Sequence, residues 1–333
     1  MNVTIKDVAK HANVSVATVS RVINGLGSVD EGLRNRVEKA IQELGFMPNH
    51  VARSLKMSAT NTIGVAVSDI SNPFFTTIAK EIENVIRKKS YSMLMVSTDS
   101  DIQKEKENIS LFESKRVDGI IVSPDSDEIA EFLRSIKTPT VAIDRKTLKN
   151  ICDSVYVDKE KSMYDIACYL FNKGHRNIGM VTGPKDLSTN YDRFNGFIKA
   201  HYDNGIPLDN ENILFGKFDT KFGKDAFAQL FSKENHPTAI VAGSALIATG
   251  FLIQAKNMNV KIPEEVSVVS FGSVGLEELI DLKITYITEL RSEIGQIAGD
   301  MILERIKHPD KPIDLRILQG TIIEGNSVKS FQI

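Results

Sequence analysis

The first 45 residues alternate short apolar repeats with polar breaks, a pattern typical of three short helices. Apolar side chains recur at helical spacing over residues 4–11, 15–24 and 30–44. Ser15 is suited to cap the second helix, and Gly45 to end the third. Two helices joined by a three-residue turn and braced by a third predict an all-α helix-turn-helix domain at the N-terminus.

The remainder of the chain alternates short apolar runs with amphipathic stretches, which predicts strands separated by helices. The apolar runs occupy residues 63–68, 93–97, 119–123, 140–144, 177–182, 239–243 and 266–271. Continuous apolar strands with helices between them, as predicted at 75–89 and 161–171, are typical of parallel sheets covered on both faces. We therefore expect an α/β fold with two doubly wound parallel-sheet lobes and a ligand crevice outside the carboxyl ends of the strands.

Composition narrows the class of protein. Hydrophobic residues make up 42% and charged residues 25% of the 333 positions, the balance of a globular protein. No apolar run approaches the ~18 residues that span a bilayer, and the first residues do not resemble a signal peptide, so we expect a cytoplasmic location. Cys152 and Cys168 are too few for a disulfide framework or a four-ligand zinc site, and we predict both to be buried small apolar side chains.

Charge is unevenly distributed along the chain. The whole chain has a formal charge of −2, whereas residues 1–60 carry eight basic and five acidic side chains, a net charge of +3. A basic N-terminal segment, called the head, joined to an acidic remainder of the chain indicates that the head binds a polyanion.

The predicted second helix carries the chemistry of the head. Its outward face is formed by Ser15, Val16, Ala17, Ser20 and Arg21. Arg21 can bond a guanine through two hydrogen bonds, and Val16 or Ala17 can contact a thymine methyl. On an isolated helix these residues would be ordinary solvated surface, but within a helix-turn-helix they favour contact with a major groove.

Three motifs resemble the LacI/GalR family of bacterial transcription regulators. They are T-I-K-D-V-A from Thr4, V-S-V-A-T-V-S-R-V-I-N from Val14, and P-N-x-V-A-R-S-L at 48–55. The resemblance implies a helix-turn-helix domain at 1–48, a hinge helix and linker at 49–59, and a periplasmic-binding-protein-like type I core at 60–333. Within that core, it places the first lobe at about 60–160 plus 290–320 and the second at about 161–290.

The resemblance also implies a set of DNA-binding residues. They are Thr4, Ser15, Val16, Ala17, Thr18, Ser20, Arg21, Asn24, Asn49, Ala52, Arg53, Leu55 and Lys56. Leu55 matches the family leucine that wedges into the minor groove and kinks the duplex, with Ala52 packed beside it. The segment from Asn49 is too short to be a stable isolated helix, in agreement with folding only on DNA. The alternative for Leu55 is a buried packing residue in a linker.

Effector-binding residues are implied at the strand ends. They are Asp69, Asn72, Phe74, Phe75, Asp144, Arg145, Arg193, Phe218, Ser244, Gly272 and Glu289. Phenylalanine rings offer flat faces to a sugar or base, and a neighbouring carboxylate and guanidinium can hold ring hydroxyls. The alternatives are a structural Asp144–Arg145 pair and phenylalanines that fill the core.

The chain departs from the family pattern in the second lobe. Gly272 replaces a carboxylate that grips sugar hydroxyls in many relatives, Ser244 and Ala245 replace the usual Thr-Asp, and Glu289 stands where glutamine is common. Three interpretations remain open: an altered or phosphorylated sugar, a non-sugar effector, or control by a phosphorylated carrier protein.

The sequence carries no enzyme signature. Its histidines are scattered, and it contains no dinucleotide loop, phosphate loop or nucleophile elbow. We predict no catalytic residue, no cofactor and no metal. The function expected is a homodimeric DNA-binding regulator, with a repressor of carbohydrate-metabolism genes favoured, that binds a near-palindromic operator under control of a small-molecule effector. The remote alternative is a sugar-binding protein without a DNA function, which would leave the head unexplained.

Overall fold

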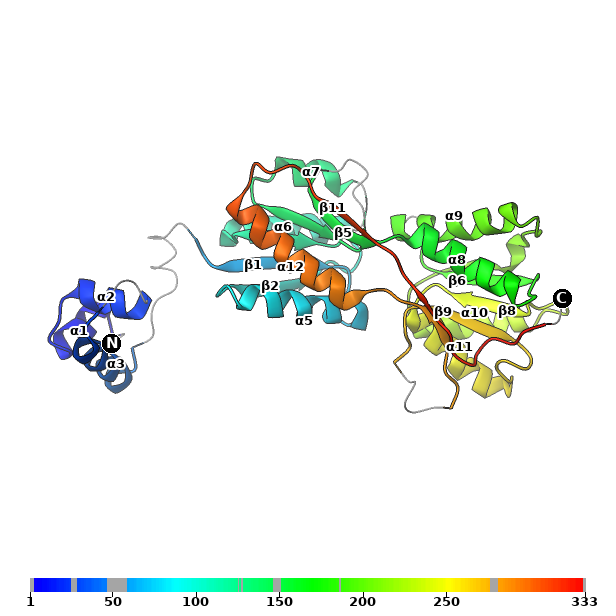
Figure 1. The fold of residues 1–333 in the computed structure, drawn as a ribbon, viewed down its shortest axis with the longest axis horizontal. Coiled ribbons are helices and arrows are strands. Elements are labelled where there is room, and N and C mark those ends of the chain that lie inside the picture. Colours follow the sequence, from blue (N-terminus) through cyan, green and yellow to red (C-terminus); the bar gives the residue numbers. More distant parts are fainter. Residues whose placement is uncertain are drawn as a thin grey trace. The chain divides into compact units, whose positions relative to one another are not determined.

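The structure is a computed structural model that describes residues 3–24, 29–46, 59–124, 126, 128–145, 151–185, 187–275 and 281–331. The chain divides into two compact units, Met1–Thr60 and Asn61–Ile333. Figure 1 shows the elements of each unit. The first unit is called the head below, and the second the core.

The head consists of three helices, as the sequence predicts. They are α1 (Ile5–His11), α2 (Val16–Asn24) and α3 (Glu31–Leu44). Local hydrogen bonds fix where each helix begins. The Asp7 carboxylate accepts from the Thr4 amide at 2.8 Å, the Ser15 hydroxyl oxygen accepts from the Thr18 amide at 3.1 Å, and the Asp30 carboxylate from the Leu33 amide at 3.1 Å.

One small apolar cluster holds the three helices together. Its buried members are Val8, Ala9, Ala12, Val19, Val37, Ala40 and Phe46. Each helix contributes one stripe to this cluster, so the opposite stripe of α2 remains exposed.

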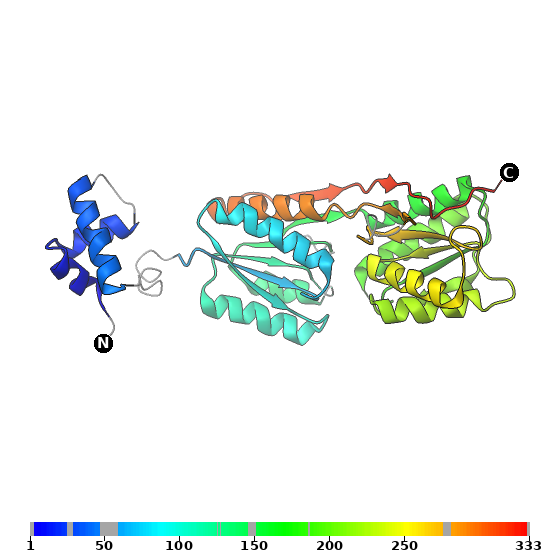
Figure 2. The same ribbon diagram turned by 90° about the horizontal axis from the view of Figure 1, so that it is seen from below.

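The first lobe of the core contains a six-stranded parallel sheet with strand order β11-β5-β4-β3-β1-β2. Its strands are β1 (Thr62–Val67), β2 (Ser92–Ser97), β3 (Gly119–Val122), β4 (Thr140–Ile143), β5 (Asp153–Val157) and β11 (Leu315–Leu318). Helices α5 (Pro73–Arg87) and α12 (Arg291–Lys307) cover one face, and α6 (Ile102–Lys115) and α7 (Ile129–Ser135) cover the other (Figure 2).

The second lobe repeats this plan with strand order β12-β10-β9-β8-β6-β7. Its strands are β6 (Ile178–Thr182), β7 (Ile213–Phe215), β8 (Ala239–Ala242), β9 (Ser267–Phe271), β10 (Thr285–Ile287) and β12 (Ile322–Ile323), the last of which is antiparallel. A short 3-10 helix, η1 (Asn210–Asn212), precedes β7. Helices α8 (Lys159–Asn172) and α9 (Ser188–Asp203) cover one face, and α10 (Thr220–Phe231) and α11 (Ala245–Met258) the other (Figure 2).

Burial explains why the central strands read as continuous apolar runs. Every residue of β3, β6, β8 and β9 is buried, as expected for strands covered on both faces. In the described residues, the chain crosses between the lobes after β5, after β10 and after β11. The carboxyl ends of both sheets, and the helices that follow them, therefore meet at the junction of the lobes.

The structure adds to the predictions and corrects one. Strands β5, β7, β10, β11 and β12 were not predicted. Strands β7, β10 and β12 have three residues or fewer and β11 lies at a sheet edge, whereas β5 is an interior strand whose apolar run is interrupted by Asp153 and Ser154. Cys152 and Cys168 are both partly exposed, so the prediction that they are buried was wrong. None of the helices in the described ranges combines the length and the hydropathy needed to span a bilayer.

Candidate nucleic-acid interface and ligand cleft

The exposed stripe of α2 is the candidate nucleic-acid surface of the head. Ser15, Val16, Ala17 and Arg21 are exposed, and Thr18 and Ser20 are half-buried. Val16, an apolar residue, is 41% exposed. The structure thus presents a methyl-bearing and hydroxyl-bearing helix face beside one arginine, the combination that can read base edges in a major groove.

The other residues predicted to contact DNA are placed differently. Thr4 is exposed, and its hydroxyl donates to the Asp7 carboxylate at 2.6 Å, so it also has a capping role. Asn24 is the last residue of α2. The remaining predicted residues lie outside the described residues: Asn49, Ala52, Arg53, Leu55 and Lys56.

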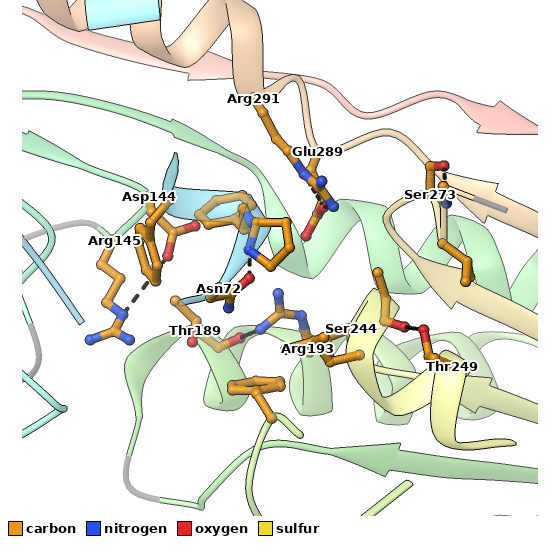
Figure 3. A pocket seen from close by; sticks show the side chains of 18 residues that line it. Asn72, Asp144, Arg145, Thr189, Arg193, Ser244, Thr249, Ser273, Glu289 and Arg291 are labelled. Atoms are coloured by element: carbon orange, nitrogen blue, oxygen red, sulfur yellow. Dashed lines mark hydrogen bonds and ion pairs between the residues drawn. The ribbon is translucent and has the colours of Figure 1, made fainter. Parts of the chain in front are cut away.

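A cavity of about 250 Å³ opens at the junction of the two lobes of the core (Figure 3). Nine of the predicted effector-binding residues line it: Asn72, Phe74, Phe75, Asp144, Arg145, Arg193, Phe218, Ser244 and Glu289. Asp69 and Gly272 do not. Asp69 is exposed, and its carboxylate accepts from the amide and the hydroxyl of Ser71, each at 2.7 Å.

The carboxylate of Asp144 is held between two cations. The Lys159 ammonium lies 2.9 Å from it, and the Arg145 guanidinium 3.9 Å. Although burial raises the pKa of Asp144, Lys159 and Arg145 hold that pKa below its ordinary value. Arg145 also donates to the Pro124 carbonyl at 3.0 Å, and Figure 3 shows its guanidinium at the edge of the group of lining residues. Asp144 is therefore an ionised acceptor at the cleft.

Glu289 and Arg291 form a second ion pair on the path from β10 to α12. The Arg291 Nε donates to the Glu289 carboxylate at 2.8 Å, and its Nη2 contacts the same oxygen. Burial raises the pKa of Glu289, although Arg291 opposes the rise. Gly272, at φ +91°, lies beside this pair, and a Cβ added there would be 3.1 Å from the Arg291 Nη2 and would overlap the Glu289 carboxylate. Glu289 thus fills the space where the sequence suggested a missing carboxylate.

Arg193 projects from α9 into the centre of the cleft (Figure 3). It is 6% exposed. Its guanidinium carbon lies 4.3 Å from the ring centre of Phe271 and 5.3 Å from that of Phe218. One Nη donates to the Thr189 carbonyl at a long 3.4 Å, while the buried Nε has no hydrogen-bond partner in the part of the chain that the structure describes.

Small polar residues at helix N-termini complete the cleft. The side-chain oxygen Oδ1 of Asn72 accepts a hydrogen bond from the Phe74 backbone amide at 3.0 Å. The hydroxyl oxygen of Ser244 accepts one from the Ile247 backbone amide at 3.3 Å. Both therefore cap helices, α5 and α11, and keep donor hydrogens for a ligand. Phe74 is half-buried and offers an apolar wall, edge-to-face with Phe75 at 5.0 Å.

Sequence reasoning missed several residues of the cleft. The lining also includes Thr189, Thr249, Ser273 and Arg291. Lys159 is not part of the lining but forms an ion pair with Asp144. Lys159 is the second residue after β5 and the first of α8, so predicting that strand would have placed the lysine close to a strand end beside Asp144. Arg291 lies two residues from Glu289 at the start of α12, which the sequence pattern did not resolve.

Comparisons with known proteins agree with this arrangement. Residues 4–49 match the model of bacterial regulatory proteins of the lacI family, and residues 60–324 match that of periplasmic binding proteins and the sugar-binding domain of the LacI family. The chain is 33% identical over 330 residues to the HTH-type transcriptional regulator RegA of Clostridium saccharobutylicum, covering 98% of this chain and 99% of that one.

Two further comparisons extend over nearly the whole chain. It is 33% identical to the HTH-type transcriptional repressor PurR of Pectobacterium atrosepticum, covering 98% of this chain and 96% of the relative. Its fold is similar to the lac repressor dimer bound to operator and the anti-inducer ONPF, with a TM-score of 0.90, 23% identity, and coverage of 99% and 100% of the two chains.

A helix-turn-helix head and a two-lobed binding core define a DNA-binding transcriptional regulator rather than an enzyme. The chain belongs to the LacI family of bacterial regulatory proteins, as its motifs predicted.

Proposed function

We propose that the protein acts in the cytoplasm as a homodimeric repressor that binds a near-palindromic operator. The observation that carries this proposal is the exposed α2 face, with Val16 and Arg21 turned away from the apolar cluster of the head. Two such faces related by a two-fold axis would read two half-sites in successive major grooves. The predicted hinge residues around Leu55 would contact the minor groove between them.

We further propose that a small molecule in the inter-lobe cleft controls operator binding. The cleft is lined from both lobes, so a bound ligand would favour one relative arrangement of the lobes over others. Coupling of ~1–3 kcal/mol between ligand and operator would be ordinary for such a switch. Carbohydrate-metabolism genes are the proposed targets, since the core matches a sugar-binding domain model.

The test is selection of duplexes from random DNA by the full chain. The proposal predicts an enriched sequence with dyad symmetry, bound by two chains per duplex in sedimentation equilibrium. Deleting residues 1–58 should abolish binding to that duplex. Enrichment of a sequence without dyad symmetry, or one chain per duplex, would contradict the dimeric operator.

A further inference from the structure

We propose that the ligand of the inter-lobe cleft is an anion, a small molecule bearing a phosphate ester or a carboxylate, whose negative group lies against Arg193. This inference deepens the proposed function, because it rests on the cleft being the input of the repressor and names the chemical class that fills it.

The first observation is the state of Arg193 itself. Arg193 is 6% exposed, and among the described residues no carboxylate forms an ion pair with its guanidinium. Its guanidinium lies against two aromatic rings and donates one long hydrogen bond to the Thr189 carbonyl. A buried cation without a counter-charge costs free energy, so its retention at the centre of a cleft indicates a ligand that supplies the charge.

The second observation is the balance of charge around the cleft. Its lining contains three arginines, Arg145, Arg193 and Arg291, against two carboxylates, Asp144 and Glu289. Asp144 forms an ion pair with Lys159, and Glu289 forms one with Arg291. Asp192, half-buried on the same helix, also acts on the charge of Arg193. The carboxylates of the cleft are thus already matched by other cations, and Arg193 is the one left over among the lining residues that the structure describes.

The third observation is geometric. Phe271 and Phe218 lie against the guanidinium of Arg193, with its carbon 4.3 and 5.3 Å from the two ring centres. Such stacking uses the faces of the guanidinium and leaves its in-plane N–H donors available. Two N–H groups in one plane match the two oxygens of a carboxylate or phosphate.

The first turn of α11 faces the same space. Ser244, Ala245 and Leu246 line the cleft, and the amides of Ala245 and Leu246 belong to the first turn, where no intrahelical carbonyl is in reach. A helix N-terminus alone would not define an anion site, but here it adds positive potential beside an unpaired buried arginine. Burial also lowers the pKa of Arg193, although the charges of Asp144 and Glu289 oppose this fall.

The experiment compares matched ligands on the full chain at constant ionic strength. The probes are glucose, glucose 6-phosphate and gluconate; ribose and ribose 5-phosphate; hypoxanthine; and inorganic phosphate and sulfate. Thermal unfolding midpoints identify binders, and calorimetric titration measures their affinities. The proposal predicts that at least one anion raises the midpoint and binds at least tenfold more tightly than its neutral counterpart. Phosphate esters and carboxylates form separate arms, so the responding arm identifies the anionic group.

Three variants separate the role of Arg193 from general effects of charge. Arg193→Gln should weaken the binding of the anion at least tenfold, and Arg193→Lys by less. Lys256→Gln, which removes an exposed charge from the last turn of α11, should leave the affinity unchanged. Without ligand, Arg193→Gln should unfold at the same temperature as the wild type or higher, because it removes an uncompensated buried charge; a structural arginine would show the opposite.

Several results would overturn the proposal. The first is a neutral sugar, or hypoxanthine, that binds as tightly as every anion. The second is an anion affinity that Arg193→Gln leaves unchanged. The third is a panel in which no anion raises the unfolding midpoint. Operator affinity is measured on the same preparations without ligand. Lost operator binding with retained anion binding would count against the proposed repressor function and leave the ligand class intact.

Discussion

The carboxylate of Glu289 occupies the space that any side chain at position 272 would need. A Cβ built on Gly272 would lie 2.5 Å from the Glu289 Cδ, far inside van der Waals contact. The lack of a side chain at Gly272 and the position of the Glu289 carboxylate therefore depend on each other. The polar group that the sequence seemed to have lost from the second lobe is supplied from the connection between β10 and α12.

Gly272→Ala is expected to destabilise the core by roughly 1–3 kcal/mol. The substitution adds a Cβ at φ +91° and forces it against Glu289. Urea unfolding of the single variant, of Glu289→Ala and of the double variant separates these two costs. Removing the Glu289 side chain should relieve the clash, so the double variant should lose less free energy of unfolding than the two single variants together. Strictly additive losses would show that Glu289 does not occupy this space.

Asp153→Asn is expected to lower the free energy of unfolding by about 3–5 kcal/mol. The Asp153 carboxylate is fully buried and accepts from Arg305 at 2.6 and 2.9 Å and from the Asp314 amide at 2.8 Å. Removing its charge leaves Arg305, on α12, without its buried partner. Asp314→Asn breaks the more exposed pair with Arg316 and serves as the control, with an effect within about 1 kcal/mol. Equal effects of the two variants would contradict the structural role of Asp153.

Stability is expected to fall as the pH drops from about 6.5 towards 4, in part because of His175. Its Nε2 hydrogen-bonds with the Lys329 carbonyl at 3.1 Å and its Nδ1 with the Thr238 hydroxyl at 2.8 Å, and the residue is buried. Burial lowers the pKa of His175 to about 4 from an ordinary 6.5, so the unfolded chain binds the proton more readily between these values. The loss is at most roughly 3 kcal/mol.

The check on His175 is thermal unfolding at pH 5.0 and 7.5. His175→Gln should show a smaller difference between the two pH values than the wild type. His201, whose pKa burial also lowers, supplies a remaining part of the dependence. A variant with the full wild-type dependence would show that His175 does not titrate as described.

Arg21→Ala is expected to weaken operator binding by about 1–3 kcal/mol and to relax preference at one base pair. Its side chain is exposed on the α2 face, where it can reach a base edge. Affinities for the selected duplex and for single-base variants of it provide the measurement. Lys39→Ala, an exposed cation on α3 paired with Glu43, is the control. A uniform loss of affinity across all duplexes would make Arg21 a phosphate contact instead.

The sequence predicted the buried parts of the fold well, because burial leaves a periodic signal. Strands β3 and β8 are apolar throughout, and α5 buries Ile78, Ile82 and Ile86 on one stripe. The edge strand β11 carries no such signal, since Leu315 and Ile317 are 40% and 51% exposed. Its place in the first sheet depends on pairing with β5, a contact between residues about 160 positions apart that no local pattern encodes.

The sequence pattern predicted site residues where they follow recognised strands, and the family resemblance added Arg193, Phe218 and Glu289. Asp144 was found because it directly follows β4, and Asn72 and Phe74 because they open the helix after β1. The partners that set their chemistry were missed. Lys159 reaches Asp144 across 15 residues, and Arg291 stacks near Phe74, 5.8 Å from its ring centre, from a helix more than 200 residues away. These two contacts depend on the path of the chain through the two lobes, which no local sequence pattern encodes.

The most direct test of the account is the affinity of the full chain for a selected dyad-symmetric duplex and for a scrambled duplex of the same composition. Fluorescence anisotropy at physiological salt provides both values. A sequence-specific repressor predicts binding to the symmetric duplex on the order of a thousandfold tighter or more. Equal affinity for the two duplexes would contradict the account.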